Sequence, residues 1–256
     1  MADESKPGRR AGGSPPLAVV TGASAGIGEA IARRLAREGY RLLLGARREE
    51  PIRKLAAELE AVGAVLDVSD EASVSSFCRL AEGAQLLVNN AGGARGADRI
   101  ADSDSAQWRW MWEVNVLGLM QVTRGLLPEL ERSGRGHIVN ISSTAGLEVY
   151  EGGAGYTGAK HAVHAISQTL RLELSGRSIR VTEVSPGMVE TEFSLNRYGG
   201  DHERAQSVYR GVTPLTGADI ADVVAFAVTR PAHVNVDQIV VRPLQQASAY
   251  KVSRRE

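Results

Sequence analysis

The chain has 256 residues, of which 43% are hydrophobic and 23% are charged, and 30 Lys and Arg balance 30 Asp and Glu. This composition is typical of a globular protein, and the length suits one large α/β domain. The balanced charge gives no overall field that favours nucleic acid or an anionic membrane. Cys78 is the only cysteine, so an internal disulfide is excluded and a reducing compartment is indicated. No metal site is predicted.

The first 16 residues form a polar segment with three Pro and three Gly. The segment lacks the apolar run of about 7–15 residues found in a signal peptide, so we predict a disordered tail. No stretch approaches the roughly 18 apolar residues needed to cross a membrane. We therefore predict a cytoplasmic protein without a membrane segment.

From Leu17 onward, short apolar runs alternate with longer segments of helical period. The short runs predict strands buried on both faces, and the periodic segments predict amphipathic helices. Strands are expected at residues 17–20, 41–45, 64–66, 85–89, 137–142, 179–184 and 237–242. Helices are expected at about 27–38, 51–62, 71–82, 107–132, 156–174 and 217–229.

Strands that alternate with helices imply parallel strands joined by right-handed crossovers. We therefore predict an α/β fold: a Rossmann-type doubly wound sheet of seven parallel strands, with helices on both faces, in a single domain over residues 17–256. Residues 192–216 form a longer polar insertion after the sixth strand. Since ligands bind beyond the carboxyl ends of such strands, the insertion is a candidate lid.

A glycine-rich segment, Thr21–Gly28, joins the first strand to the first helix. Its glycines, Gly22, Gly26 and Gly28, follow the spacing G-x-x-x-G-x-G rather than the more common G-x-G-x-x-G. A diphosphate needs backbone N–H groups aimed at it, and glycine lets the backbone approach closely. The position between a buried strand and an amphipathic helix predicts a phosphate-binding loop, to which Ser24 and Ile27 also contribute.

Tyr156 and Lys160 lie four residues apart at the start of a predicted helix, so their side chains share one face. Tyrosine ionises near pH 10, and a nearby ammonium lowers that pKa toward the range that acid/base catalysis needs. The pair is therefore a candidate catalytic site. A solvated pair on an exposed helix is the alternative.

Polar and small residues also follow two predicted strands. Ser143 ends the strand before Tyr156, where its hydroxyl can hydrogen-bond a substrate carbonyl oxygen, and Ser142 is the competing hydroxyl. The segment Asn89–Gly92 ends the preceding strand with small residues that admit a flat ring. For either serine, a plain turn residue at a strand end is the alternative.

Together these motifs resemble the short-chain dehydrogenase/reductase family, over essentially the whole chain from residue 17 to about 243. The motifs that carry the resemblance are Thr21–Gly28, Asn89–Gly92, Asn115, Ser143, Tyr156-x-x-x-Lys160 and Pro186-Gly187.

The resemblance implies roles for four catalytic residues. Tyr156 would be the general acid in carbonyl reduction and the base in alcohol oxidation. Lys160 would hold the nicotinamide ribose and lower the Tyr156 pKa, and Ser143 would orient the substrate oxygen. Asn115 would hold a water that joins Lys160 to solvent. Considered alone, Asn115 is a polar residue within a helix that bonds back to its own helix.

The second predicted strand ends at Ala46, Arg47 and Arg48. An acidic residue here would accept the ribose hydroxyls of NAD, whereas arginine pairs with the 2′-phosphate of NADP. We therefore predict NADP(H), although arginine is this chain's usual basic residue. By resemblance, Asp67 and Val68 would contact the adenine; capping of the next helix is the alternative for Asp67.

The resemblance adds further contacts to the predicted cofactor site. Asn89, Ala91 and Gly92 would line the dinucleotide. The segment after the sixth strand would line the nicotinamide through Pro186 and Gly187. Val189 and Thr191 would reach its carboxamide. A plain helix start at Thr191 is the alternative.

Two segments narrow the resemblance to one branch of the family. Residues 191–193 and 230–243 resemble bacterial NADP-dependent 3-hydroxy acid dehydrogenases and clavulanate dehydrogenase. This implies hydride transfer to or from a small carbonyl compound or secondary alcohol, such as a 3-hydroxy acid. A ketoacyl or steroid reductase and a non-catalytic NADP-binding sensor are the alternatives. A substrate carboxylate would need a lid cation or hydroxyl, for which Arg197, Arg204 and Tyr198 are candidates or merely exposed lid residues.

The resemblance also implies a homo-oligomer, either a tetramer or a dimer. An apolar stripe on the Tyr156 helix is a candidate interface, and core packing explains it equally well. The stripe comprises Ala162, Ile166, Leu170 and Leu174. Three tryptophans, Trp108, Trp110 and Trp112, cannot share one helix face at a spacing of two, so at least one is expected to be partly exposed.

Overall fold

The protein is described by a computed structural model that covers residues 14–255. Within this range seven strands form one parallel sheet in the order β3-β2-β1-β4-β5-β6-β7. The strands are β1 (Leu17–Thr21), β2 (Arg41–Ala46), β3 (Val62–Val65), β4 (Ala84–Asn89), β5 (Gly136–Ile141), β6 (Ile179–Pro186) and β7 (Gln238–Val241). The predicted doubly wound Rossmann-type sheet is confirmed. Its strand order reverses between β1 and β4, the position where such sheets bind their ligands.

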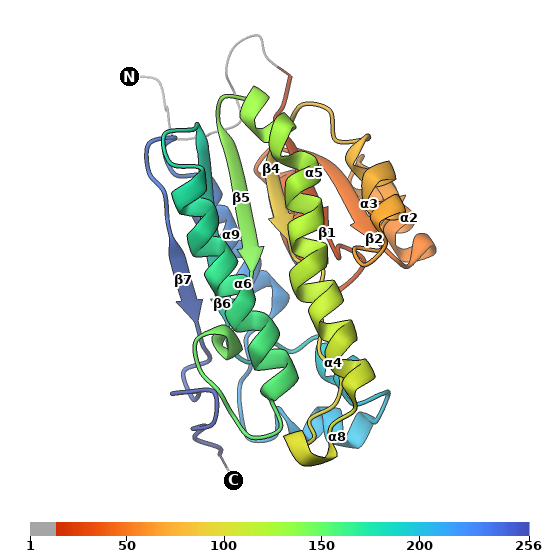
Figure 1. Cartoon of the computed structure of the whole chain (residues 1–256), viewed down its shortest axis with the longest axis vertical. Helices are drawn as coiled ribbons and strands as arrows, with labels where there is room; N and C mark the ends of the chain where they lie inside the picture. Colours follow the sequence, from red (N-terminus) through yellow and green to blue (C-terminus); the bar gives the residue numbers. More distant parts are fainter. Residues whose placement is uncertain (1–13, 256) are drawn as a thin grey trace.

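Helices cover both faces of the sheet (Figure 1). One face packs against α1 (Gly26–Arg37), α2 (Glu49–Glu58) and α9 (Gly217–Val228). The other packs against α3 (Glu71–Cys78), α5 (Gly118–Arg132) and α6 (Ala154–Glu173). Each helix buries an apolar stripe on the sheet and leaves its charged face to solvent, as the helical period predicts.

The third strand differs from its prediction. It spans Val62–Val65 rather than residues 64–66, and α2 ends at Glu58 rather than continuing to 62. The reason is local: Glu60 takes a left-handed conformation with φ of 52°, which ends the helix and turns the chain into the strand. The residues from Val62 to Leu66 form an unbroken apolar run, so the strand itself was found and only its start was placed two residues late, within the expected helix.

The long predicted helix over residues 107–132 contains an interruption. It divides into α4 (Ser105–Trp112), a π-helical turn η2 (Glu113–Leu117) and α5. Such turns often occur at functional sites, and this one contains Asn115. An apolar period alone does not reveal the extra residue that a π-helical turn accommodates.

The insertion at 192–216 lies at the end of the molecule to which the strands point (Figure 1). It contains two short helices, α7 (Phe193–Arg197) and α8 (His202–Ser207). The C-terminal residues run along it, since Arg254 donates to the carbonyl of Val208 over 3.1 Å and Gln245 to that of Gly211 over 2.9 Å. The two segments together form one side of the site described below.

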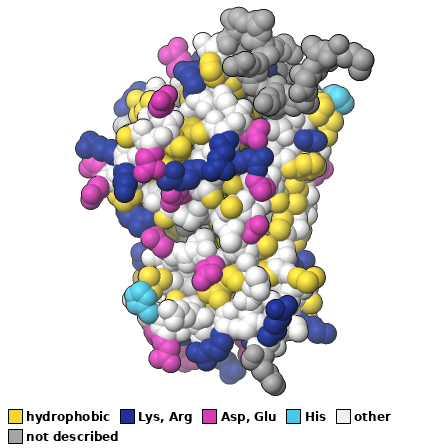
Figure 2. Space-filling view, turned by 180° about the vertical axis from the view of Figure 1, so that it is seen from behind, with side chains coloured by type: hydrophobic (Ala, Val, Ile, Leu, Met, Phe, Trp, Pro, Cys, Tyr) yellow, Lys and Arg dark blue, Asp and Glu magenta, His cyan; other side chains and the backbone are white. Residues whose placement is uncertain are grey.

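Most of the predicted tail, residues 1–16, lies outside the described residues. Of the described part, Pro15 and Pro16 accept hydrogen bonds from Arg41 through their carbonyls. Over residues 14–255 no helix is both long and apolar enough to cross a membrane. On the face seen in Figure 2, basic and acidic side chains are interspersed rather than gathered by sign.

Candidate active site

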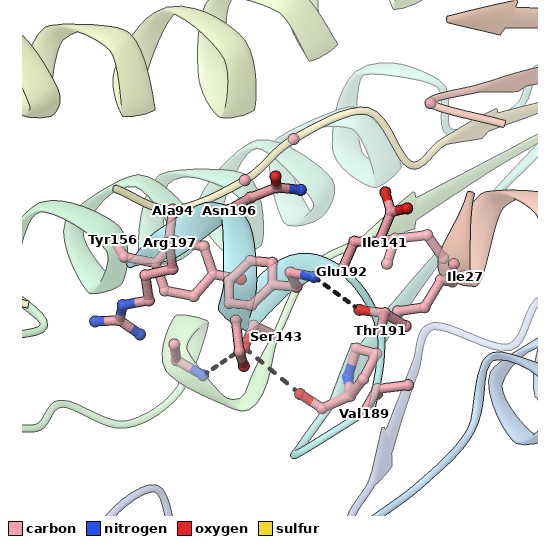
Figure 3. Close-up of a pocket in the computed structure, with 18 of the residues that line it drawn as sticks. Ile27, Ala94, Ile141, Ser143, Tyr156, Val189, Thr191, Glu192, Asn196 and Arg197 are labelled. Carbon is pink, nitrogen blue, oxygen red and sulfur yellow. Dashed lines mark hydrogen bonds between the residues drawn. The ribbon is translucent and has the colours of Figure 1, made fainter. Parts of the chain in front are cut away.

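A cavity of about 940 Å³ opens at the carboxyl ends of the strands. It brings together segments that follow β1 to β6, the insertion and the C-terminal residues. Figure 3 shows Tyr156 and Arg197 on one side of this cavity and Ile27 on the other. Most of the predicted cofactor residues line it, namely Gly22, Ser24, Gly26, Ile27, Arg47, Arg48, Asp67, Val68, Ala91, Gly92, Pro186, Gly187, Val189 and Thr191. The predicted catalytic residues Ser143, Tyr156 and Lys160 line it as well.

The phosphate loop needs its glycines for close packing. Gly22 has a φ of 65°, and a Cβ there would lie 2.8 Å from the Cα of Ala91. A Cβ on Gly28 would lie 2.3 Å from the carbonyl oxygen of Gly22. Gly28 therefore allows the first turn of α1 to pack beneath the loop, although it does not itself line the cavity. The loop leaves backbone N–H groups at a helix N-terminus, an arrangement that suits a diphosphate.

Asn90, which the sequence analysis did not single out as a contact of its own, holds this loop in place. Its Nδ2 donates to the carbonyls of Thr21 and Gly22 over 3.0 and 3.1 Å. The Thr21 hydroxyl accepts in return from the backbone N–H groups of Asn90 and Ala91, each over 3.0 Å. A polar residue directly after a buried strand was the available signal.

Asn89 lies apart from the other predicted cofactor residues. Its side chain is 4% exposed and does not line the cavity. Its Nδ2 instead donates to Thr123 Oγ1 and Asn140 Oδ1, both over 2.9 Å. Successive side chains of a strand point to opposite faces, and Asn89 faces the α5 side of the sheet.

Two arginines line the cavity at the end of β2. Arg48 forms an ion pair with Glu192 over 3.1 Å and so connects this end to the insertion. Arg47 is exposed and has no hydrogen-bonding or ionic partner among residues 14–255. Asp67 lines the cavity nearby, and its Oδ1 accepts from both the N–H and the hydroxyl of Ser69. The helix cap suggested for Asp67 is supplied by Asp70 instead.

Tyr156 and Lys160 are both buried, with exposures of 8% and 6%. Lys160 Nζ lies 5.8 Å from the centre of the Tyr156 ring and donates to the carbonyl of Ile141 at the end of β5 over 3.0 Å. The pair is therefore not the solvated helix pair that the sequence left open. Ser143 Oγ accepts from the N–H of Ala145 over 3.1 Å, so it also caps the short turn η3 (Thr144–Gly146).

Burial dominates the electrostatics of this pair. Burial raises the pKa of Tyr156 well above its ordinary value, and Tyr150 adds to this effect. Ser143, through a hydrogen bond, and the charge of Arg197 lower the same pKa by less. Burial also lowers the pKa of Lys160 to about 8, opposed by Glu183. The expectation that the Tyr156 pKa is lowered is therefore wrong for the protein without nucleotide, because the desolvation of a phenolate outweighs the nearby cations.

Asn115 lies beside the cavity rather than in its lining. Its Nδ2 donates to the carbonyls of Met111 and Gly93 over 2.7 and 2.8 Å, and its Oδ1 accepts from the N–H of Gly93 over 3.1 Å. The bond back to its own helix is therefore present, and so is a connection to the loop after β4. A side chain at Gly92 would lie 2.5 Å from Asn115 Oδ1 and 3.7 Å from Lys160 Nζ, which places Asn115 near the lysine.

Two of the three tryptophans are exposed, as the spacing of two predicted. Trp108 and Trp112 have exposures of 38% and 46%. Trp110 lines the cavity, with the guanidinium of Arg95 stacked 4.0 Å from its ring centre. Of the predicted lid residues, Arg197 and Tyr198 line the cavity, and Arg204 does not.

The C-terminal segment contributes residues to the cavity wall that the sequence analysis missed. Gln246 is 6% exposed, and its Oε1 accepts from the N–H of Met188 over 2.8 Å. Tyr250 and Arg254 also line the cavity. This polar stretch has neither period nor motif, so no signal in the sequence points to it.

Comparison with known protein families shows which family has this combination of loop, strand-end serine and Tyr–Lys pair. The sequence profile described as short chain dehydrogenase matches residues 16–199. The chain belongs to the short-chain dehydrogenase family. The resemblance predicted from its motifs is confirmed, and the match covers the predicted phosphate loop, the candidate catalytic pair and the start of the insertion.

Individual members of the short-chain dehydrogenase family are similar over nearly their whole length. The chain is 43% identical to sulfoacetaldehyde reductase 2 of Chromohalobacter salexigens, over 93% of this chain and 98% of the relative. It is 39% identical to the NADP-dependent 3-hydroxy acid dehydrogenase of Salmonella typhi, over 91% and 97%. Among solved structures, the closed form of serine dehydrogenase complexed with NADP+ superimposes with a TM-score of 0.89 at 36% identity, covering 94% of this chain and all of that one.

Proposed function

We propose that the protein is an NADP(H)-dependent oxidoreductase that transfers hydride between the nicotinamide and a small carbonyl compound or secondary alcohol. The substrate class is a 3-hydroxy acid or a related compound. One observation carries the proposal: a single cavity joins the phosphate loop, the free Arg47 and the buried pair of Tyr156 and Lys160. A protein that only binds NADP has no need of a buried tyrosine at the far end of the nucleotide site.

The residues present fit the dinucleotide. The cradle at Gly22 and Gly28 leaves no room for side chains, and the backbone there can approach a diphosphate. At the end of β2 an apolar Ala46 precedes Arg47, whose guanidinium forms no hydrogen bond or ion pair with residues 14–255 and can pair with a 2′-phosphate. The 3-hydroxy acid dehydrogenase relative is named as NADP-dependent, and the serine dehydrogenase structure contains NADP+.

The bound nicotinamide supplies or accepts the hydride. Tyr156 gives its phenolic proton to the carbonyl oxygen in reduction and removes the hydroxyl proton in oxidation. Ser143, which lines the same cavity, would orient the reacting oxygen. Lys160 would hold the ribose hydroxyls, and its ammonium favours the phenolate; Val189 and Thr191 would hold the carboxamide. In reduction the carbonyl carbon gains a hydride and its oxygen a proton, and NADPH becomes NADP+.

Removal of the Arg47 side chain tests the cofactor assignment. We expect wild-type protein to bind NADPH about 10- to 100-fold more tightly than NADH, since a charge-assisted hydrogen bond to the phosphate is worth about 1.5–3 kcal/mol. Arg47→Ala should abolish this difference and leave the Kd for NADH unchanged. Fluorescence titration with both nucleotides measures it, and Arg53→Ala on the exposed face of α2 is the control. A wild-type preference for NADH would contradict the assignment.

We also propose that the protein works in the cytoplasm as a homo-oligomer, a dimer or a tetramer. Within the α6 stripe, Leu170 and Leu174 pack into the core, which favours the core-packing explanation there. Apolar side chains are exposed instead where α4 meets α5, with Leu117 at 39% and Met120 at 36%. The double substitution Leu117→Glu and Met120→Glu should convert the oligomer to monomer in sedimentation velocity. A monomeric wild-type protein would contradict the proposal.

A further inference from the structure

Helix α7 presents two side chains to Tyr156. The Phe193 ring centre lies 5.5 Å from that of Tyr156, and the Arg197 guanidinium carbon lies 5.9 Å from the same ring centre. Residues four apart share one face of a helix. The insertion therefore covers the tyrosine with the apolar ring of Phe193 and, one turn further on, with the cation of Arg197. Figure 3 shows Arg197 on the same side of the cavity as Tyr156.

The Arg197 guanidinium is held in a fixed orientation. Its Nε donates to the carbonyl of Gly96 over 2.9 Å, and its Nη1 donates to the hydroxyl of Tyr150 over 3.0 Å. The backbone carbonyl of Arg197 also accepts from the N–H of Gly96 over 2.9 Å. A guanidinium has five N–H donors, so these two side-chain contacts leave donors on Nη1 and Nη2 for another acceptor.

Among the residues that the structure describes, no acidic side chain neutralises this cation within the cavity. Asp67 and Glu192 are the acids among the described residues that line the cavity, and Glu192 is paired with Arg48 at the dinucleotide end. Arg197 has no ion-pair partner among residues 14–255. Arg95, Arg254, Arg47 and Arg48 also line the cavity, so its charged side chains are mostly cationic. A half-buried, unpaired guanidinium beside the reacting group favours an anionic ligand.

The compounds named for the relatives share one chemical feature. In sulfoacetaldehyde, in a 3-hydroxy acid and in serine oxidised at carbon 3, one carbon separates the reacting carbon from a sulfonate or carboxylate. A compound of this kind is short enough for the reacting oxygen to reach Tyr156 while the anion meets a guanidinium beside the same ring. An arginine fork matches either anion through two parallel hydrogen bonds.

We propose that Arg197 binds the carboxylate or sulfonate of a short aliphatic substrate whose reacting carbon is separated from that anion by one carbon. This rests on the proposed function and narrows its substrate class. It also distinguishes Arg197 from Arg204, which stacks on the Tyr198 ring at 4.5 Å and does not line the cavity.

The experiment compares anionic substrates with an uncharged analogue of the same length. Oxidation of 3-hydroxypropionate, L-serine, 2-hydroxyethanesulfonate and 3-hydroxypropionamide is followed with NADP+ at the nicotinamide absorbance. For Arg197→Gln we expect kcat/KM for the preferred anion to fall about 100-fold, mostly through KM, because a charge-assisted bidentate contact is lost. For the amide, kcat/KM should stay within about threefold, and Arg197→Lys should restore part of the loss. The anion that wild-type protein prefers distinguishes carboxylate from sulfonate substrates.

Two controls separate recognition from structure. Arg204→Gln should leave every rate unchanged. The Kd of Arg197→Gln for NADPH should match that of wild type, which would show that the Arg197→Gln protein is folded. A parallel fall for anion and amide would overturn the proposal, because Arg197 would then only fix the insertion in place. Wild-type turnover of the amide equal to that of the anions would overturn it while leaving the oxidoreductase assignment intact. If nothing is oxidised and no corresponding aldehyde is reduced, both proposals fail.

Discussion

Replacement of Tyr156 by Phe is expected to lower kcat by about 10³-fold while leaving the Kd for NADPH within about twofold. General acid/base catalysis typically contributes about 10²–10⁴-fold, and the substitution removes the only atom that moves the proton. The ring remains, so its contact with Phe193 and the shape of the cavity are kept. Steady-state rates and nucleotide titration on the same preparation measure both quantities.

Tyr40→Phe is the matched control for this result. Tyr40 is a partly buried tyrosine that packs against the core formed by α1, α2 and α9, away from the cavity. Its loss of a hydroxyl should leave both kcat and the Kd for NADPH unchanged. If Tyr156→Phe turned over at the wild-type rate, the proposed mechanism would be wrong, whatever the nucleotide preference.

The arrangement of the sheet was predictable because it depends on a pattern repeated along the chain. Buried parallel strands are largely apolar and the helices between them have one apolar face, so all seven strands were found to within two residues. The misplaced end of α2 has a local cause. The left-handed Glu60 that ends α2 carries no glycine or proline to mark it.

The candidate site was predictable because parallel strands place their carboxyl ends together. Ser143 and Lys160, far from Gly22 in sequence, meet around one cavity for that reason. The points that the sequence left unresolved depended on which of two adjacent residues faces the cavity, or on how deeply a side chain is buried. Asn89 and Asn90 are adjacent, yet one faces the core and the other holds the phosphate loop.

The sign of a pKa shift is a further limit of sequence reasoning. The spacing of Tyr156 and Lys160 shows that they are neighbours, but not that both are removed from water. In the structure burial outweighs the nearby cations, and the pKa of Tyr156 rises. Likewise Arg197, Arg204 and Tyr198 were equivalent candidates in sequence, and only their contacts with Tyr156 and with each other separate them.

Replacement of Lys160 by Met is expected to abolish activity and weaken NADPH binding, yet to stabilise the nucleotide-free protein. Burial lowers the pKa of Lys160 from 10.5 to about 8, which corresponds to about 3 kcal/mol against the charged form in the folded state. Methionine fills a similar volume without this penalty. The lost hydrogen bond to the carbonyl of Ile141 offsets about 1–2 kcal/mol of the gain. The net increase in the free energy of unfolding at pH 7 is therefore about 1–2 kcal/mol, or a few degrees in Tm.

The pH dependence of this gain follows from the direction of the pKa shift. Because the folded pKa is lower than the unfolded one, the unfolded chain binds the proton first as the pH falls from 10.5 to about 8. Wild-type protein therefore loses stability over that interval, and the loss is complete below about pH 8. The advantage of Lys160→Met should be largest at pH 7, should vanish as the pH rises, and should become a small deficit near pH 10.5, where only the lost hydrogen bond to Ile141 remains.

Thermal unfolding of both proteins without nucleotide, at pH 7 and near pH 10, measures this effect. Lys54→Met, at an exposed position of α2, is the control and should change Tm little at either pH. A Met variant that is less stable than wild type at pH 7, or equally favoured at both pH values, would contradict the argument. Saturating NADPH should reverse the order of stability, because the ligand stabilises only the state that binds it, and we propose that Lys160 is part of that binding site. With this result, the Lys160 ammonium would destabilise the nucleotide-free protein and would be compensated when NADPH binds. We would then infer that Lys160 is retained for catalysis rather than for folding.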